Sequence, residues 1–190
     1  MRATLLITLG LALTITLICM AVVASSRTHV LPNENWDMGL MRCAGEPCFL
    51  GITPGKTTWV AAVAALGNDS KYAKVVLVPS EHSNSVDSIF IEPLIERPIT
   101  VGEIMALYGT PSCVDIYRQS STVELNYRLL HVLTQFTDNQ IRPDAYVTFI
   151  VMENPSVYPT QCDSIDGYKR QAIRRFWQGF ASEQYYLDAK

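Results

Sequence analysis

Residues 52–67 read Ile52-Thr-Pro-Gly-Lys-Thr-Thr-Trp-Val-Ala-Ala-Val-Ala-Ala-Leu-Gly67, and residues 99–109 read Ile99-Thr-Val-Gly-Glu-Ile-Met-Ala-Leu-Tyr-Gly109. Both segments start with Ile-Thr, continue into an apolar run and end at glycine. Threonine is favoured at the N-cap of a helix, and glycine tolerates the left-handed backbone that often follows the last helical turn. The segments 51–67 and 99–109 therefore predict an internal duplication in which each copy contributes a short helix.

The ends of the two helices can be placed from their capping residues. Thr57 or Thr58 is the expected N-cap of the first helix, which ends at Gly67. In the second helix Thr100 and Glu103 form a capping box. Both helices are too short to be stable alone, so each must pack against a sheet. The side chains expected to face inward are Trp59, Ala62, Val63 and Leu66 in the first helix and Ile104, Leu107 and Tyr108 in the second.

Apolar stretches between and after the helices predict five strands, over residues 75–78, 86–91, 113–117, 123–135 and 145–152. The Asp138-Asn-Gln link favours a hairpin, so 123–135 should pair antiparallel with 145–152. Residues 123–129 alternate in polarity. This alternation predicts a buried side made of Val123, Leu125, Tyr127 and Leu129 and a solvent side made of Glu124, Asn126 and Arg128.

The C-terminal segment from residue 164 to 184 has a helical period. Its apolar positions are Ile165, Tyr168, Ala172, Ile173, Phe176, Trp177 and Phe180. Lys169, Arg170, Arg174 and Arg175 line the flank of this stripe. A helix that docks its aromatic face on the sheet is the expected structure. The alternative is a basic amphipathic helix that lies on an anionic lipid surface.

The N-terminus predicts export. Leu5 to Ala24 is a run of 20 uncharged residues preceded by Arg2. Residues 1–26 are therefore a signal peptide, cleaved near Ala24, or a membrane anchor that uses Leu5 to Ala24 as its span. Either way the amino terminus starts inside and the bulk of the chain is extracytoplasmic. Residues 27–50 read as a linker and a cysteine-containing entry loop, and residues 51–190 as one domain.

Four cysteines remain beyond the leader, and an oxidising compartment would pair them. Cys43 with Cys48 and Cys113 with Cys162 are the favoured disulfides. No metal site is expected, because the cysteines lack a Cys-x2-Cys spacing and the three histidines are scattered. No cofactor motif is present in the sequence either.

The charge balance and the spacing of reactive side chains limit the classes of function that the sequence supports. The 15 Lys and Arg against 18 Asp and Glu give a net charge of -3, which does not favour nucleic acid as a partner. No catalytic residue is assigned. The nearest candidates for an exported hydrolase are Ser80 with His82 and Cys113 with His131. A Gly-x-Ser-x-Gly nucleophile motif is absent from the sequence.

The three tryptophans are candidates for a binding interface, because exposed tryptophans often anchor protein contacts. They are Trp36, Trp59 and Trp177. Burial in the core is the competing interpretation for each of them.

Two resemblances bear on the fold and function. The motif Gly51-Ile-Thr-Pro-Gly-Lys-Thr-Thr-Trp59 and the segment from Thr100 to Cys113 are similar to segments of uncharacterised exported bacterial proteins. The capped helix that ends in Gly-Thr-Pro and leads into strands resembles the small outer-membrane lipoprotein fold of the BamE (SmpA/OmlA) type. The duplicated arrangement is similar to beta-lactamase-inhibitor-protein domains. These resemblances imply a non-catalytic protein that binds other envelope proteins through sheet or loop surfaces.

The sequence as a whole predicts an α+β domain. Two short helix-plus-strand units form one antiparallel sheet with the helices packed on one face, behind an N-terminal transmembrane or signal helix. The expected function is binding of an unknown envelope protein, or a part in an envelope assembly, without catalysis. An exported hydrolase is the alternative.

Overall fold

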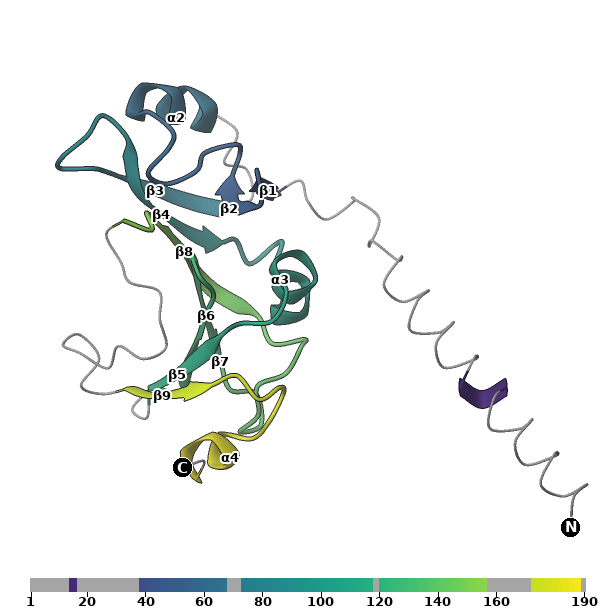
Figure 1. The fold of residues 1–190 in the computed structure, drawn as a ribbon. Helices are drawn as coiled ribbons and strands as arrows, with labels where there is room; N and C mark the ends of the chain where they lie inside the picture. Colours follow the sequence, from purple (N-terminus) through teal and green to yellow (C-terminus); the bar gives the residue numbers. More distant parts are fainter. Residues whose placement is uncertain (1–13, 17–37, 68–72, 118–119, 157–171, 189–190) are drawn as a thin grey trace, which may run out of the picture. The chain divides into compact units, whose positions relative to one another are not determined.

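The computed structural model describes residues 14–16, 38–67, 73–117, 120–156 and 172–188 (Figure 1). The chain divides into two units, Met1–Asn35 and Trp36–Lys190. Residues 14–16 of the first unit are helical. None of the described helices is long and apolar enough to span a bilayer. Most of the predicted leader, residues 1–26, lies outside the described residues, so the choice between signal peptide and anchor stays a prediction.

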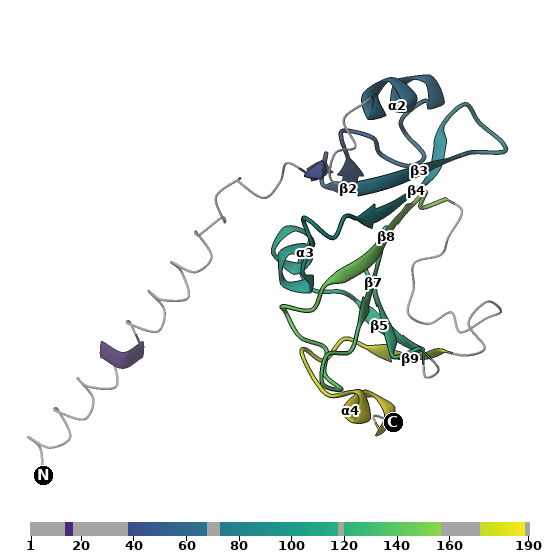
Figure 2. The ribbon, with the colours of Figure 1, turned by 180° about the vertical axis from the view of Figure 1, so that it is seen from behind.

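A seven-stranded antiparallel sheet forms the body of the second unit (Figures 1 and 2). In spatial order its strands are β3 (Ala73–Pro79), β4 (Val86–Pro93), β8 (Val147–Glu153), β7 (Leu130–Gln135), β6 (Thr122–Asn126), β5 (Cys113–Tyr117) and β9 (Ala172–Phe176). A separate hairpin consists of β1 (Leu40–Cys43) and β2 (Glu46–Phe49). The predicted α+β class with an antiparallel sheet is confirmed.

Three helices accompany the sheet in the described part of this unit: α2 (Trp59–Leu66), α3 (Val101–Tyr108) and α4 (Glu183–Asp188). The predicted caps of α2 and α3 are confirmed. The Thr100 hydroxyl accepts a hydrogen bond from the Glu103 N–H at 3.3 Å, and a Glu103 carboxylate oxygen accepts one from the Thr100 N–H at 2.7 Å. Thr58 caps α2 through one longer bond, 3.4 Å from the Ala61 N–H.

The starts of α2 and α3 are attached to the sheet in the same way. In each copy the residue after the N-cap donates to a carbonyl just before a strand, and the first residue of that strand donates back. For α2 the bonds are Trp59 N–H to Asn84 O and Val86 N–H to Thr57 O, both 3.0 Å. For α3 they are Val101 N–H to Ala145 O at 2.9 Å and Val147 N–H to Ile99 O at 2.8 Å. The two helices are thus attached through equivalent hydrogen bonds. That the two units arose by an internal duplication stays a prediction.

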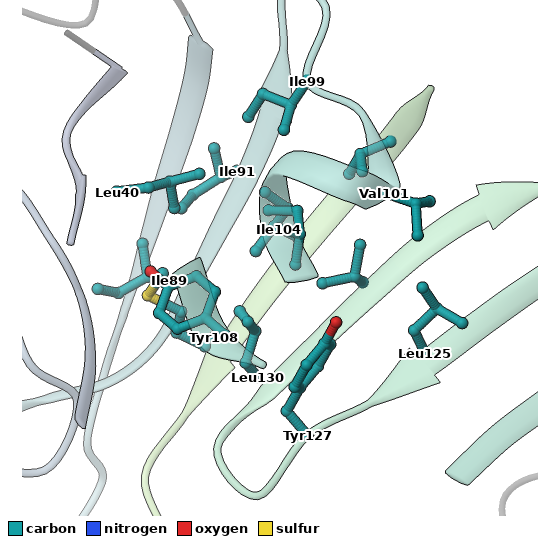
Figure 3. Close-up of a cluster of buried hydrophobic side chains, with 14 of the residues drawn as sticks. Leu40, Ile89, Ile91, Ile99, Val101, Ile104, Tyr108, Leu125, Tyr127 and Leu130 are labelled. Atoms are coloured by element: carbon teal, nitrogen blue, oxygen red, sulfur yellow. The ribbon is translucent and has the colours of Figure 1, made fainter. Parts of the chain in front are cut away.

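The core lies between α3 and one face of the sheet, which we call the core face (Figure 3). Ile104 of α3 is buried, with Ile89 and Ile91 of β4 and Leu130 of β7 in the same cluster. The ring of Tyr108 meets Tyr127 edge-on, and its hydroxyl donates to the Met41 carbonyl at 3.1 Å. α3 therefore joins the β1–β2 hairpin to the sheet. α2 is packed less deeply, since Ala62 is its one fully buried residue and Val63, expected to face inward, is 50% exposed.

The predicted strand over residues 123–135 is two strands in the structure. β6 and β7 pair with each other around a tight turn, in which the Tyr127 N–H donates to the Leu130 carbonyl at 2.8 Å. The polarity alternation continues through this turn, so it does not mark where the strand ends. The pairing of β7 with β8 and the turn at Asp138 are confirmed. Asp138 and Asn139 both have positive φ, as a two-residue hairpin turn requires.

The predicted C-terminal helix is wrong over the described residues. Residues 172–176 form β9, which pairs with β5, and helix begins only at Glu183. In a strand the side chains alternate, so Arg174 and Phe176 point to one face of the sheet and Ile173 and Arg175 to the other. The ion pair of Arg174 with Asp115 of β5 is a contact that the helical period could not anticipate.

The capping box makes a stability prediction. Thr100→Ala removes the acceptor for the Glu103 N–H and should lower the free energy of unfolding by about 1 kcal/mol or more. Thr58→Ala is the matched control, with a smaller expected loss because the Thr58 bond is longer and has no reciprocal partner. Urea unfolding of the two variants measures both values. An equal or larger loss in Thr58→Ala would contradict the importance of the box.

Candidate functional site

The sheet has a second face, opposite the core face, which we call the open face. One row of side chains on it is given by the strand register, and reads Val76, Phe90, Val151, His131, Asn126, Cys113 and Phe176 from β3 to β9. The buried residues of α2, α3 and α4, among them Ala62, Ile104 and Tyr186, all belong to the core cluster. No residue of the open-face row belongs to that cluster. The described helices therefore contribute to the other side of the sheet.

A buried ion pair lies on the open face where β5 meets β9. Nε of Arg174 is 2.6 Å from Oδ1 of Asp115, and Nη2 is 2.7 Å from Oδ2. Asp115 is only 1% exposed. Asn126 of β6 adds a hydrogen bond, from its Nδ2 to Asp115 Oδ2 at 3.1 Å. The hydrogen bond to Asp115 raises the pKa of Arg174, so the guanidinium stays charged.

His131 of β7 continues this network towards β8. Its Nδ1 lies 2.6 Å from Asn126 Oδ1 and 3.0 Å from Glu124 Oε1, and its Nε2 lies 3.1 Å from Glu153 Oε2. All three neighbours are acceptors, so both ring nitrogens must carry a proton. Burial lowers the pKa of His131, but the two carboxylates outweigh it and raise the value to about 9. His131 is therefore an imidazolium at neutral pH.

Tyr117 of β5 completes the network, because its hydroxyl donates to Glu124 Oε2 at 2.7 Å. Burial, followed by this hydrogen bond to a carboxylate, raises the pKa of Tyr117. We call this set the polar network; its members are Asp115, Tyr117, Glu124, Asn126, His131, Glu153 and Arg174. Glu124 and Asn126 are 7% and 5% exposed, so their predicted placement in solvent is wrong. Arg128, predicted on the same side, is exposed.

The other half of the open face carries a cluster of apolar side chains on β3, β4, β7 and β8, with the exposed Lys74–Glu92 pair at its edge, and we call it the apolar half. Phe90 of β4 and Phe149 of β8 are partly exposed, with ring centroids 5.9 Å apart. Val76 of β3 is 60% exposed, and Leu133 and Val151 are partly exposed. The open face thus combines a polar half with fixed hydrogen bonds and an apolar half that solvent reaches.

The cysteines predicted to be bridged can be located in part. The Cys43–Cys48 disulfide is confirmed, with a Cα–Cα distance of 5.7 Å. Cys113 is also disulfide-bonded. Cys162 lies outside the described residues, so its pairing with Cys113 stays a prediction.

The residues predicted to form interfaces are dispersed. Trp59 and Trp177 are partly buried against the core, and Trp177 contacts Phe180 and Tyr186. Trp36 lies outside the described residues. Their role in an interface stays a prediction, and the apolar half of the open face was not found from sequence. Its signal was available in the period-two pattern of β4 and β8, which places Phe90 and Phe149 opposite their buried neighbours.

The basic residues predicted to lie on a membrane surface do not form one helical flank. Arg174 is bound to Asp115 on the open face. Arg175 is on the core face, where its Nε donates to the Tyr186 carbonyl at 3.1 Å. Lys169 and Arg170 lie outside the described residues. The side chains of Arg174 and Arg175 therefore hold β9 and α4 in place.

Neither pair proposed for a hydrolase is assembled in the described residues. The thiol of Cys113 is consumed in a disulfide, and both nitrogens of His131 are bound to other groups. Ser80 and His82 are linked by the His82 backbone N–H, which donates to the Ser80 hydroxyl at 3.4 Å. No contact joins the His82 ring to Ser80 among the described interactions.

Two further findings concern ligands and relatives. The described residues hold no group of three His, Cys, Asp or Glu side chains that could bind a metal ion. Comparison with known proteins gives no match to a family model, a curated protein or a solved structure. The similarity to exported bacterial proteins and to the BamE type therefore stays a prediction from the motifs.

The buried ion pair makes the first prediction of this site. Asp115→Asn removes the buried carboxylate that pairs with the Arg174 guanidinium and should lower the free energy of unfolding by about 3 kcal/mol or more. Glu92→Gln is the matched control, because Glu92 is 52% exposed and its pair with Lys74 should contribute less than about 1 kcal/mol. Urea unfolding compares the two. Similar losses of unfolding free energy in the two variants would show that the buried ion pair stabilises the fold no more than the exposed one.

The second prediction concerns the bridge at Cys113. With Cys43 and Cys48 joined to each other, Cys19 and Cys162 are the remaining cysteines of the chain. A non-reducing peptide map should join the peptide of Cys113 to that of Cys162. A Cys113 peptide joined to Cys19, or to a second chain, would overturn this pairing.

Proposed function

We propose that this chain is a non-catalytic, exported or membrane-tethered protein that binds another protein of the cell envelope through its open face. The observation that carries the proposal is the composition of that face. Val76, Phe90 and Phe149 leave apolar surface in contact with water, and the buried residues of the described helices all belong to the core cluster on the opposite side of the sheet. Exposed apolar patches bordered by polar groups are typical of protein-binding surfaces.

The polar network supports the same proposal. Its charged groups are already paired within the chain, as Asp115 is with Arg174 and Glu124 is with His131. A partner that covers the network therefore need not supply counter-charges for them, and side chains held in this way lose little entropy on binding. A surface that is ordered before the partner arrives favours specific association.

The location follows from two features. The uncharged run from Leu5 to Ala24 favours export, and the disulfide between Cys43 and Cys48 is of the kind that persists in oxidising compartments. The partner is therefore sought among envelope proteins, and the membrane is a second contact wherever the leader is retained.

Photo-crosslinking in intact cells tests the proposal. A benzophenone amino acid placed at Val76 should capture a discrete envelope protein, whereas the same group at Val60 on α2 should not. The two valines are matched in exposure, at 60% and 70%, and they lie on different elements. Val76→Asp should abolish crosslinking from a probe at Phe149, because it places a charge in the apolar half.

Two outcomes contradict the proposal. Capture from position 60 but not from position 76 would place the interface on α2. Hydrolysis of model esters or peptides that is lost in His82→Ala would favour the exported hydrolase.

A further inference from the structure

We propose that His131 is a pH-sensitive latch that fastens the end of β8 to the polar network, and that loss of one imidazole proton opens its contact with Glu153. The latch is built from three neighbouring strands. His131 of β7 lies between Glu124 of β6 and Glu153 of β8, and it donates to both carboxylates. A neutral imidazole has a single N–H to donate, so it can donate to only one of the two sides, Glu124 or Glu153.

The geometry decides which side opens. Nδ1 has two acceptors, Asn126 Oδ1 at 2.6 Å and Glu124 Oε1 at 3.0 Å, whereas within the described part of the chain Nε2 has one, Glu153 Oε2 at 3.1 Å. The last proton therefore stays on Nδ1. The lone pair of Nε2 then faces the Glu153 carboxylate, and the two repel each other.

The surroundings of His131 give the direction of the pH dependence. Among the residues that the structure describes, Glu124 of β6 and Glu153 of β8 contact His131, and Asp115 and Tyr117 of β5 and Arg174 of β9 are linked to it through the polar network. The next strand, β4, places the neutral Ser88 beside Glu153. Deprotonation of His131 removes one positive charge from beside the two carboxylates that contact it.

The sign of the linkage follows from the two states of the chain. The pKa of His131 is about 9 in the fold against the ordinary value of 6.5. The stabilisation by the latch is therefore complete below about pH 6.5 and is lost as the pH rises through about 9. Tyr117 keeps its proton across this window, because burial and its bond to Glu124 raise its pKa.

Opening of the latch affects the end of β8. Glu153 is followed by Asn154, whose N–H donates to the Asp87 carbonyl at 2.9 Å and whose Nδ2 donates to Asp87 Oδ1 at 3.2 Å. A Cβ built on Gly55 would lie 2.5 Å from Asn154 Oδ1, so the loop before α2 fits closely against this side chain. Release of the Glu153 side chain should therefore change the packing of Asn154 against the loop that precedes α2. Any effect on partner binding rests on the function proposed above.

Imidazole ¹⁵N NMR of the full chain tests the latch. His131 should titrate with a midpoint near 9 and should keep its proton on Nδ1 above that midpoint, while the amide signals of Glu153 and Asn154 shift with the same midpoint. Glu153→Gln should lower the midpoint by about one pH unit or more, because it removes one carboxylate. Glu92→Gln, a half-exposed carboxylate on β4, is the control that should leave the midpoint unchanged.

Several results would overturn the latch. They are an unchanged midpoint in Glu153→Gln, a neutral form protonated on Nε2, or amide signals of Glu153 that do not follow the His131 titration. If Glu153→Gln fails to fold, the tautomer and the amide shifts of the unaltered chain still decide.

The effect on binding is tested separately, by crosslinking from position 76 in isolated membranes below and above the transition. A lower yield above it supports regulation of the open face by the latch. Equal yields overturn that regulation and leave the latch itself standing on the NMR result. No capture at neutral pH contradicts the proposed function and not the latch.

Discussion

The buried carboxylate of Asp115 is the constraint around which the sheet is organised. A carboxylate that is 1% exposed in the middle of a strand must be paired and hydrogen-bonded, or its burial would cost several kcal/mol. Arg174 meets both of its oxygens from β9, and Asn126 reaches one of them from β6. One buried charge thus specifies both neighbours of β5. It also fixes the amide of Asn126 with its oxygen towards His131, which carries the network on to Glu153 of β8.

The features that were predictable from sequence depend on contacts within a few residues. The capping box of Thr100 and Glu103, the positive φ values at Asp138 and Asn139, and the Cys43–Cys48 bridge each need only a short segment to form. For the same reason the period-two pattern placed Leu125 correctly on the buried side. Local chemistry determines these features, so they can be recognised without knowledge of the rest of the chain.

The errors arose where a distant residue decides the structure. The segment from Ala172 to Phe176 is a strand because β5 offers it a hydrogen-bonding edge and a buried carboxylate, and neither is visible in its own helical spacing. Glu124 is buried because Tyr117 and His131 satisfy its two oxygens from flanking strands. A polar residue at every second position of a strand therefore shows that these side chains share one face of the sheet. It does not show that this face is exposed to solvent. The apolar half of the open face was not predicted, because the sequences of the helices do not show which face of the sheet they cover.

The two halves of the open face depend on each other. If valine and phenylalanine continued across all seven strands, the sheet would expose one broad apolar surface, which favours non-specific association. The polar network borders the apolar area of β3, β4, β7 and β8, and beyond it the exposed ring of Phe176 on β9 lies on the same face. Asp115 is paired with Arg174 and Glu124 with His131, so the network borders that area with its own ion pairs in place. His131 also lies against Glu153, so the network reaches the apolar half at β8. An apolar segment of a partner can therefore settle beside Phe90 and Phe149 while the neighbouring network keeps its own hydrogen bonds.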